Sequence, residues 1–291
     1  MKFKGTGVAL VTPFKKDGSI DEKGLRKLVD FQIENGTDFL IVHGSTGEAA
    51  TLSESEKKDT LAIVIEQNAG RLPIVLGMAD NNTAALVEKI KAFDSKGIDA
   101  YLSASPHYNK PSQNGIINHF KAIADVADKP IILYNVPGRT ASNMTAQTTL
   151  ELAKHHNIIG MKEASANLEQ VMQIIKNAPE DFVILSGEDA LTLPILALGG
   201  HGVISVVANA LPKEFSTMVN ASFNGDWEVA KHNHYKVLDI TNMFFAEGNP
   251  SGIKACLDIL NICSDTVRLP LTTVSDTLKQ HMKLELEKIK K

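Results

Sequence analysis

Two stretches of the sequence, IILYNVPGRT at residues 131–140 and IIGMKEAS at residues 158–165, decide the fold. Each begins with a short apolar run that lacks polar alternation, which indicates a strand buried on both faces of a parallel sheet. Outward from these two stretches, such runs recur about every 20 to 35 residues, roughly the span of a βα unit. The eight runs are residues 8–12, 39–43, 74–77, 100–104, 131–135, 158–162, 183–186 and 203–207.

The segments between the runs have the pattern of amphipathic helices. Residues 25–33 carry apolar side chains at positions i, i+3, i+4 and i+8, which lie on one helix face. Ser53 followed by Glu56 has the spacing of a capping box at the start of the next helix. Eight βα units that pair in parallel close as a TIM barrel, and the length of 291 residues agrees with this fold.

The competing fold is an open, doubly wound sheet. It is disfavoured because the first apolar run is not followed by a glycine-rich dinucleotide fingerprint. After about residue 225 the strand pattern disappears, and residues 226–245, 251–260 and 272–290 have helical patterns. We therefore predict an α/β protein with a (β/α)8 barrel and its active site in residues 1–225, and a C-terminal helical region in residues 226–291.

Composition limits the possible partners. The formal net charge is −4 and no basic stripe is present, so nucleic acid is not an expected partner. Residues 1–14 hold too short an apolar run for a signal peptide, and no segment approaches the roughly 20 apolar residues of a membrane helix. The two cysteines, Cys256 and Cys263, fit a reducing compartment. We expect a cytoplasmic protein with no membrane association.

The active site of a TIM barrel lies at the C-terminal ends of its strands. Lys162 closes the sixth run after Ile-Ile-Gly-Met, and an apolar wall favours the neutral amine that a Schiff-base nucleophile requires. Tyr134 closes the neighbouring run and has a phenol that can transfer protons. On position alone, a lysine that reaches water and a core tyrosine are the more common cases.

Other polar residues follow the same ends of the runs. Ser45 and Thr46 lie between glycines, where backbone N–H groups and hydroxyls can hold a carboxylate, although turn chemistry accounts for them equally. Arg139 offers a fork for a second carboxylate or is an ordinary surface arginine. Tyr108 follows the fourth run and is otherwise a loop aromatic. Each signal is weak alone, but together at one barrel mouth they favour a catalytic site.

Metal chemistry has little support in the sequence. The histidines at 155 and 156 are adjacent and those at 232 and 234 are two apart, so neither pair shares a helix face. His43 and His201 fall near the mouth without a carboxylate at ligand spacing, and we expect structural roles for them. We predict no metal and no organic cofactor.

With these residues identified, the chain resembles the pyruvate-dependent Schiff-base aldolase family, which contains the dihydrodipicolinate (4-hydroxy-tetrahydrodipicolinate) synthases and N-acetylneuraminate lyase. The resemblance covers essentially the whole chain. Its most specific motifs occur in order at barrel spacing. They are GSTGEAATLS (44–53), SPHYNKPSQNG (105–115), YNVPGRT (134–140), IIGMKEAS (158–165), LSGEDA (185–190), GGHGVISV (199–206) and GNPSGIK (248–254).

The resemblance implies roles for the catalytic residues. Lys162 would form an imine with pyruvate. Tyr134, Ser45 and Tyr108 would form a proton relay, with Tyr108 contributed by a neighbouring subunit. The reaction implied is the condensation of pyruvate with L-aspartate 4-semialdehyde to 4-hydroxy-tetrahydrodipicolinate, in lysine (diaminopimelate) biosynthesis.

It also implies roles in substrate binding and assembly. Thr46 and its loop would hold the pyruvate carboxylate, and Arg139 would anchor the aldehyde substrate. Gly187 and Ile204 would contribute backbone contacts. The family assembles as a homotetramer, a dimer of dimers, and needs no cofactor.

Two departures from the synthase pattern bear on this reading. Ser45-Thr46 stands where the synthases usually have two threonines and is also typical of N-acetylneuraminate lyase. An aldolase for N-acetylneuraminate or a 2-keto-3-deoxy sugar acid therefore stays open, as do a non-catalytic keto-acid-binding barrel and, more remotely, a metal-dependent hydrolase. Ala85 stands where lysine-inhibited enzymes commonly have a glutamate, which predicts weak or absent inhibition by lysine. The positions that resemble the lysine site are Ala49, Glu54, Lys57, Asn81, Ala85 and His107.

Overall fold

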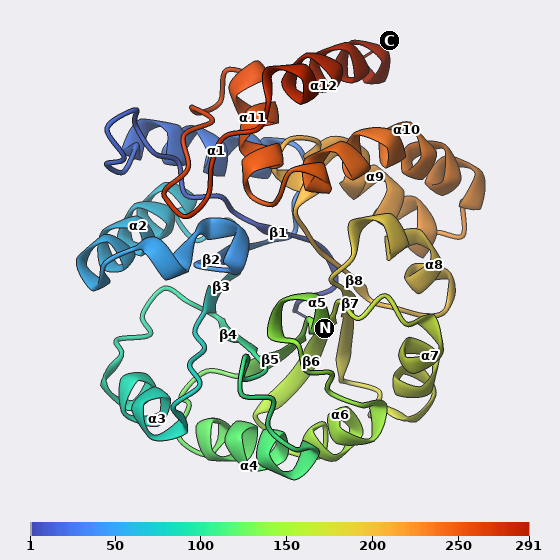
Figure 1. Cartoon of the computed structure of the whole chain (residues 1–291). Coiled ribbons are helices and arrows are strands. Elements are labelled where there is room, and N and C mark those ends of the chain that lie inside the picture. Colours follow the sequence, from blue (N-terminus) through green and yellow to red (C-terminus); the bar gives the residue numbers. More distant parts are fainter. Residues whose placement is uncertain (1, 291) are drawn as a thin grey trace. The chain divides into compact units, whose positions relative to one another are not determined.

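The structure is a computed structural model that describes residues 2–290, and its eight strands form a closed barrel in chain order (Figure 1). The strands are β1 (Gly5–Ala9), β2 (Phe39–Val42), β3 (Ile74–Gly77), β4 (Ala100–Ala104), β5 (Ile131–Asn135), β6 (Ile158–Glu163), β7 (Val183–Ser186) and β8 (Gly202–Ser205). Within each compact unit the neighbouring strands pair in parallel. The predicted (β/α)8 fold is confirmed.

Helices follow the strands throughout the chain. The α-helices are α1 (Glu22–Glu34), α2 (Glu54–Asn68), α3 (Thr83–Ala92), α4 (Gln113–Ala124), α5 (Pro137–Thr140), α6 (Ala146–Leu152), α7 (Leu168–Asn177), α8 (Thr192–Ala197), α9 (Pro212–Phe223), α10 (Trp227–Ala246), α11 (Ser251–Ile259) and α12 (Asp276–Ile289). Short 3-10 turns are η1 (Ser45–Gly47), η2 (Ala49–Thr51), η3 (Asp189–Leu191) and η4 (Val207–Asn209).

Two compact units make up the chain. The first comprises residues 2–4 and 73–204, and the second comprises residues 5–72 and 205–290. The predicted boundary between residues 225 and 226 stays a prediction, and residues 1 and 291 of its two ranges lie outside the described residues. No helix within residues 2–290 is long and apolar enough to cross a membrane.

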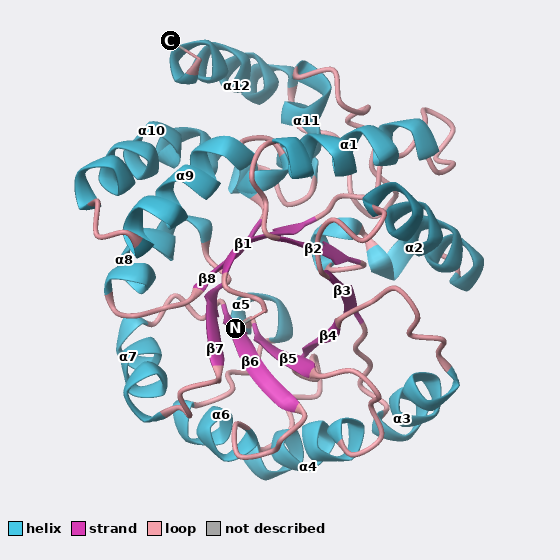
Figure 2. Ribbon diagram, turned by 180° about the vertical axis from the view of Figure 1, so that it is seen from behind, coloured by secondary structure: helices cyan, strands magenta, loops and turns pink. Residues whose placement is uncertain are grey.

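The first unit carries strands β3 to β7 and most of β8. In Figure 2, helices α3, α4, α6 and α7 lie outside strands β4 to β7. The strands are buried at nearly every position, because sheet pairing and the helix layer cover both of their faces. Gly160 in β6 is required by close packing, since a Cβ there would lie 2.6 Å from the Val183 carbonyl oxygen of β7.

In the second unit, β1 and β2 are accompanied by α1, α2 and the helices from α9 onward. The predicted capping box is present: Ser53 accepts from the backbone of Glu56, whose side chain accepts from the backbone of Ser53. Helices α10, α11 and α12 confirm the helical pattern predicted after residue 225. Both cysteines are free and buried; burial raises the pKa of the Cys256 thiol and raises the pKa of Cys263 to about 12.

The predicted bounds are wrong by three residues for the first strand and by one to two residues for the last, and hydrogen bonds explain where each strand ends. β1 ends at Ala9, and the backbone N–H of Val11 instead donates to the side chain of Asn209 at 3.1 Å. β8 ends at Ser205, whose hydroxyl accepts from the backbone N–H of Ala208 at 2.8 Å and so begins the turn η4. Side chains, rather than a neighbouring strand, satisfy the backbone at these two points.

Candidate active site

The structure brings Lys162 and Tyr134 together. They are register partners at the C-terminal ends of β6 and β5, and their Cβ atoms point to the same side of the sheet. The Lys162 Nζ lies 4.3 Å from the centroid of the Tyr134 ring. Only 4% of Lys162 and 8% of Tyr134 is exposed, so the alternative of a lysine that simply reaches water is wrong. A buried amine beside a phenol is an arrangement suited to nucleophilic catalysis with proton transfer.

Charged groups surround this pair on neighbouring segments of the same unit. Arg139 lies in the one-turn helix α5, which begins at Pro137 directly after β5. Glu188 follows β7, and burial, with the charge of Asp189, raises its pKa. The charges of Lys162 and Arg139 act in the opposite direction on the same carboxyl group. Lys162 and Arg139 are therefore both within electrostatic range of Glu188, a residue that had no role in the sequence prediction.

Gly187 has a steric reason to be glycine. A Cβ at this position would lie 2.6 Å from the Ala164 Cβ and 3.1 Å from the Lys162 Cγ. Its backbone N–H donates to the Glu163 carbonyl at 2.7 Å. Ile204 is a buried residue of β8, with 1% exposed. The backbone contacts predicted for Gly187 and Ile204 with substrate remain predictions.

Behind the lysine and tyrosine lies a set of polar contacts that the sequence prediction missed. Asn135 and Glu163 directly follow Tyr134 and Lys162, so their side chains point to the opposite face of the strands. The Asn135 Nδ2 donates to the two Glu163 carboxylate oxygens at 3.2 and 3.1 Å, and the Gln170 Nε2 donates to one of them at 3.0 Å. The only sequence signal was the acidic residue that follows the lysine in IIGMKEAS.

In the second unit, the loop after β2 is held by side chains from distant parts of the chain. His43 directly follows β2 and has a φ of 59°, and Ser45–Gly47 form the 3-10 turn η1. The Thr12 hydroxyl donates to the Gly47 carbonyl at 2.6 Å, and the Asn249 amide donates to the Thr46 hydroxyl at 3.0 Å. Thr46 is buried and Ser45 is exposed. Sequence reasoning missed Asn249, although it lies in the quoted motif GNPSGIK.

A buried ion pair follows the same loop. Glu48 and Lys254 contact each other at 2.5 Å, and their side chains are 1% and 0% exposed. The backbone N–H of Arg268 also donates to Glu48 at 3.0 Å, and Lys254 donates to the Thr266 carbonyl at 2.9 Å. The Lys254 Nζ lies 4.1 Å from the Phe14 ring centroid. Burial lowers the pKa of Lys254, while the Glu48 charge opposes that change.

Tyr108 differs from the other predicted site residues because it projects into solvent. It is 88% exposed, has a φ of 67° and donates its backbone N–H to the Thr140 carbonyl at 3.3 Å. The resemblance assigns it to the site of a neighbouring subunit, and that role stays a prediction.

The histidines near the strand ends make structural contacts. The His43 Nε2 lies 2.8 Å from the Thr60 hydroxyl, and the His201 Nδ1 accepts from the backbone N–H of Ile184 at 3.1 Å. Across the part of the chain that the structure describes, no three His, Cys, Asp or Glu residues are grouped so as to hold a metal ion.

A (β/α)8 barrel with a buried lysine against a tyrosine at its strand ends has the layout of a Schiff-base aldolase. Comparison with known proteins defines the family. The sequence model described as the dihydrodipicolinate synthetase family matches residues 2–289. The chain belongs to this family, and the predicted class of enzyme, a lyase, is confirmed.

Individual relatives match over nearly their full length. The chain is 51% identical to the 4-hydroxy-tetrahydrodipicolinate synthase of Koribacter versatilis, over 99% of this chain and 95% of the relative. A solved dihydrodipicolinate synthase from Aquifex aeolicus matches with a TM-score of 0.94 and 38% identity, over 99% and 98% of the two chains. The chloride-inhibited dihydrodipicolinate synthase of Acinetobacter baumannii, solved in complex with pyruvate, matches with a TM-score of 0.95 and 36% identity, over 99% of each chain.

Proposed function

We propose that the protein condenses pyruvate with L-aspartate 4-semialdehyde to give 4-hydroxy-tetrahydrodipicolinate, in the diaminopimelate route of lysine biosynthesis. The observation that carries the proposal is the Lys162 amine, buried against the ring of Tyr134 at the end of β6. Family membership supports the same reaction, because the relatives that match over the whole chain are named for it.

The chemistry begins at Lys162. Its neutral amine attacks the keto carbon of pyruvate, and the resulting carbinolamine loses water to give an iminium ion. The positive nitrogen withdraws electrons, so the methyl group loses a proton and an enamine forms. The enamine carbon then bonds to the aldehyde carbon of the second substrate. The amino group of the product finally displaces Lys162 as the ring closes, which regenerates the free amine.

Each proton transfer needs a group beside the reacting atoms. Tyr134 lies next to the Lys162 amine and would donate a proton to the hydroxyl that leaves as water. Ser45 and Tyr108 would complete the relay to solvent, with the exposed Tyr108 supplied by a neighbouring subunit. This assignment follows the family resemblance.

Substrate carboxylates need donors and positive charge. The turn Ser45–Gly47 presents hydroxyl and backbone N–H groups, and Thr46 in this turn would hold the pyruvate carboxylate. Arg139, in α5, would anchor the carboxylate of the aldehyde substrate. Gly187 and Ile204 would contact substrate through their backbones.

Assembly and location belong to the same proposal. A homotetramer, as a dimer of dimers, would supply Tyr108 across a subunit interface. A cytoplasmic location agrees with the two free, buried cysteines, because such thiols persist in a reducing compartment. Small-molecule substrates, rather than nucleic acid or membrane, are the partners that we propose.

The test is borohydride trapping with pyruvate, read by intact-protein and peptide mass spectrometry. We expect a stable adduct on Lys162 in the wild type and none in Lys162→Ala, whose folding is checked by circular dichroism. A folded wild type without an adduct would contradict the Schiff base. Aspartate semialdehyde is tested next as the second substrate.

One alternative rests on the Ser45-Thr46 pair, which is also typical of N-acetylneuraminate lyase. Cleavage of N-acetylneuraminate or of a 2-keto-3-deoxy sugar acid, with no activity toward aspartate semialdehyde, would establish that alternative. An adduct with pyruvate but no turnover of any aldehyde would indicate a non-catalytic barrel that binds a keto acid.

A further inference from the structure

Glu163 is a buried carboxylate that the proposed mechanism does not use. It is 2% exposed, and all of its side-chain partners are N–H donors: the Ser165 backbone at 2.7 Å, the Asn135 amide and the Gln170 amide. A protonated acid would need an acceptor for its hydrogen, and none of these groups is one. The site is therefore matched to the carboxylate. Within residues 2–290, no cation forms an ion pair with it.

Such a group is expensive for the fold. A buried charge that is held only by neutral donors costs free energy relative to an apolar side chain of similar size. Packing alone therefore does not account for a glutamate at this position, and the contacts of Glu163 indicate a further role.

The contacts of Glu163 lie directly behind the Lys162–Tyr134 pair. Tyr134 pairs with Lys162, and on the next rung Asn135 pairs with Glu163. Successive side chains of a strand point to opposite faces, so the Asn135–Glu163 hydrogen bonds fix the two strand ends from the outer face. Because a register slip would turn side chains to the wrong face, this contact keeps the amine and the phenol side by side.

The same contacts extend to the loop that starts with α5 and carries Arg139. The Asn135 Oδ1 accepts from the Met144 backbone N–H at 2.9 Å, and the Gln170 Nε2 donates to the Met144 carbonyl at 3.1 Å. The Glu163 carbonyl also accepts from Gly187, which follows β7. Glu163 is thus connected to β5 through Asn135, to the end of the Arg139 loop through Asn135 and Gln170, and to the residue after β7 through its backbone carbonyl.

We propose that Glu163 is a positioning residue for the reaction: its carboxylate, through Asn135 and Gln170, holds Lys162 and Tyr134 in the paired geometry that imine formation and proton transfer require. The proposal rests on the proposed function, since it assumes that Lys162 is the nucleophile. It predicts that the loss of Glu163 lowers the rate of the chemical steps more than it weakens pyruvate binding.

The first test compares two carboxylate-to-amide changes in the same unit. Glu163→Gln removes the charge and places an amide against three donors. Asp128→Asn is the matched control, because Asp128 accepts from Ser95 and from the Tyr101 hydroxyl but precedes β5 at its other end. The single-turnover rate of borohydride trapping with pyruvate is measured for each, per folded protein, together with kcat and KM.

We expect Glu163→Gln to lower the trapping rate and kcat about tenfold or more, with KM for pyruvate within about threefold of wild type. Asp128→Asn should trap at the wild-type rate. A trapping rate and kcat of Glu163→Gln within twofold of wild type would overturn the proposal. The same holds if the lower activity is explained entirely by a smaller amount of folded protein.

Two further measurements keep the test decisive. If Glu163→Gln does not fold, Gln170→Leu removes one donor from the same carboxylate; we expect its trapping rate to fall about threefold, and an unchanged rate would overturn the proposal. Wild-type protein that fails to trap pyruvate would contradict the proposed function itself. Trapping by wild type and by Glu163→Gln at equal rates would contradict only the role of Glu163.

Discussion

The buried pair of Lys254 and Glu48 allows a quantitative prediction. Lys254→Met removes the ammonium and keeps most of the apolar stem, so little cavity forms. The change leaves the Glu48 carboxylate, 1% exposed, with the backbone N–H of Arg268 as its remaining donor. It also removes the donation to the Thr266 carbonyl and the contact with the Phe14 ring.

Removal of one partner from a buried ion pair typically costs about 3–5 kcal/mol, because an uncompensated charge stays behind. The remaining donor to Glu48 and the retained stem favour the lower end, and we expect a loss of about 3 kcal/mol in the free energy of unfolding. Adding Glu48→Gln removes the stranded charge. The double variant should therefore be about 2 kcal/mol more stable than the sum of the two single changes predicts.

The assay is urea unfolding followed by circular dichroism, at one protomer concentration for all variants. Lys279→Met is the control, since Lys279 pairs with Asp258 and Asp265 in a more exposed position; it should cost no more than about 1 kcal/mol. A loss below about 1 kcal/mol for Lys254→Met, or strictly additive single changes, would refute the reasoning.

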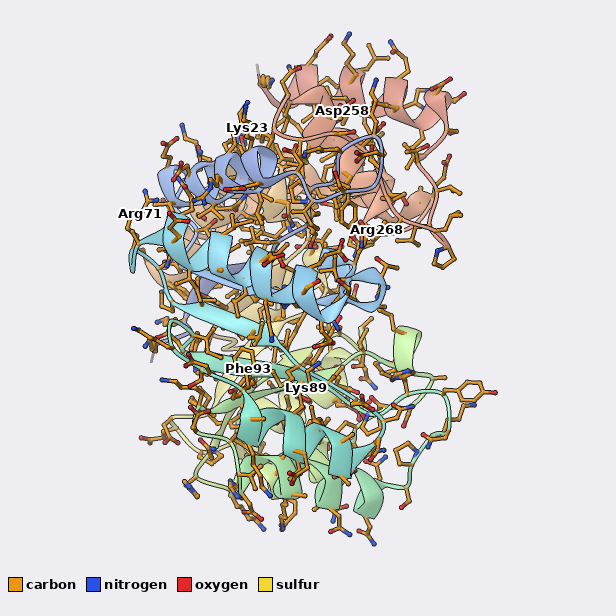
Figure 3. The ribbon with its side chains drawn as sticks, turned by 90° about the vertical axis from the view of Figure 1, so that its left-hand side faces the viewer. Lys23, Arg71, Lys89, Phe93, Asp258 and Arg268 are labelled. Atoms are coloured by element: carbon orange, nitrogen blue, oxygen red, sulfur yellow. The ribbon has the colours of Figure 1, made fainter. Side chains whose placement is uncertain are left out.

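Three other predictions concern the site, acid stability and regulation. Tyr134→Phe should lower kcat by about a hundredfold or more with little change in pyruvate affinity, because it removes a proton donor; a change confined to KM would indicate a packing role. The hydrogen bond from Arg268, labelled in Figure 3, lowers the pKa of Glu56 from 4.5 to about 2, so the stability from this contact is present above pH 4.5 and is lost as the pH falls through 2. Glu56→Gln should cost about 1 kcal/mol at pH 7 once solvent screening is discounted, and its stability should converge with that of wild type near pH 2; an equal difference at both pH values in acid titrations would contradict this. Ala85 predicts less than twofold inhibition at low-millimolar lysine in a steady-state assay, whereas strong inhibition would show that lysine binds without a glutamate there.

The sequence predicted the barrel because burial on both faces leaves a strong local signal. Six of the eight apolar runs match a strand to within one residue at both ends, as 131–135 does for β5. The same reasoning located Lys162 and Tyr134, since each closes such a run. The structure places the two side chains together, with the Lys162 Nζ 4.3 Å from the centroid of the Tyr134 ring, and their catalytic roles stay a prediction.

The buried polar residues that support the site, Glu163, Glu48 and Lys254, have no comparable pattern in the sequence. Glu163 directly follows Lys162 but points to the opposite face, so its partners lie on other segments of the chain. Glu48 and Lys254 are 206 residues apart, and neither sequence neighbourhood indicates that the other will neutralise it. Pairing of buried polar groups depends on tertiary contacts, which hydrophobic periodicity does not encode.

The two buried thiols make it possible to measure local opening of the native enzyme by thiol labelling. A maleimide or disulfide reagent reacts with an accessible thiolate, and Cys256 and Cys263 offer none while the C-terminal segment is closed. The labelling rate therefore measures how often the C-terminal segment that carries the two cysteines opens, without any denaturant. Because Cys256 is two positions from Lys254 on α11, the labelling rate of Cys256 should rise in variants that break the Lys254–Glu48 ion pair. A fold without disulfides thus carries its own reporter of local opening.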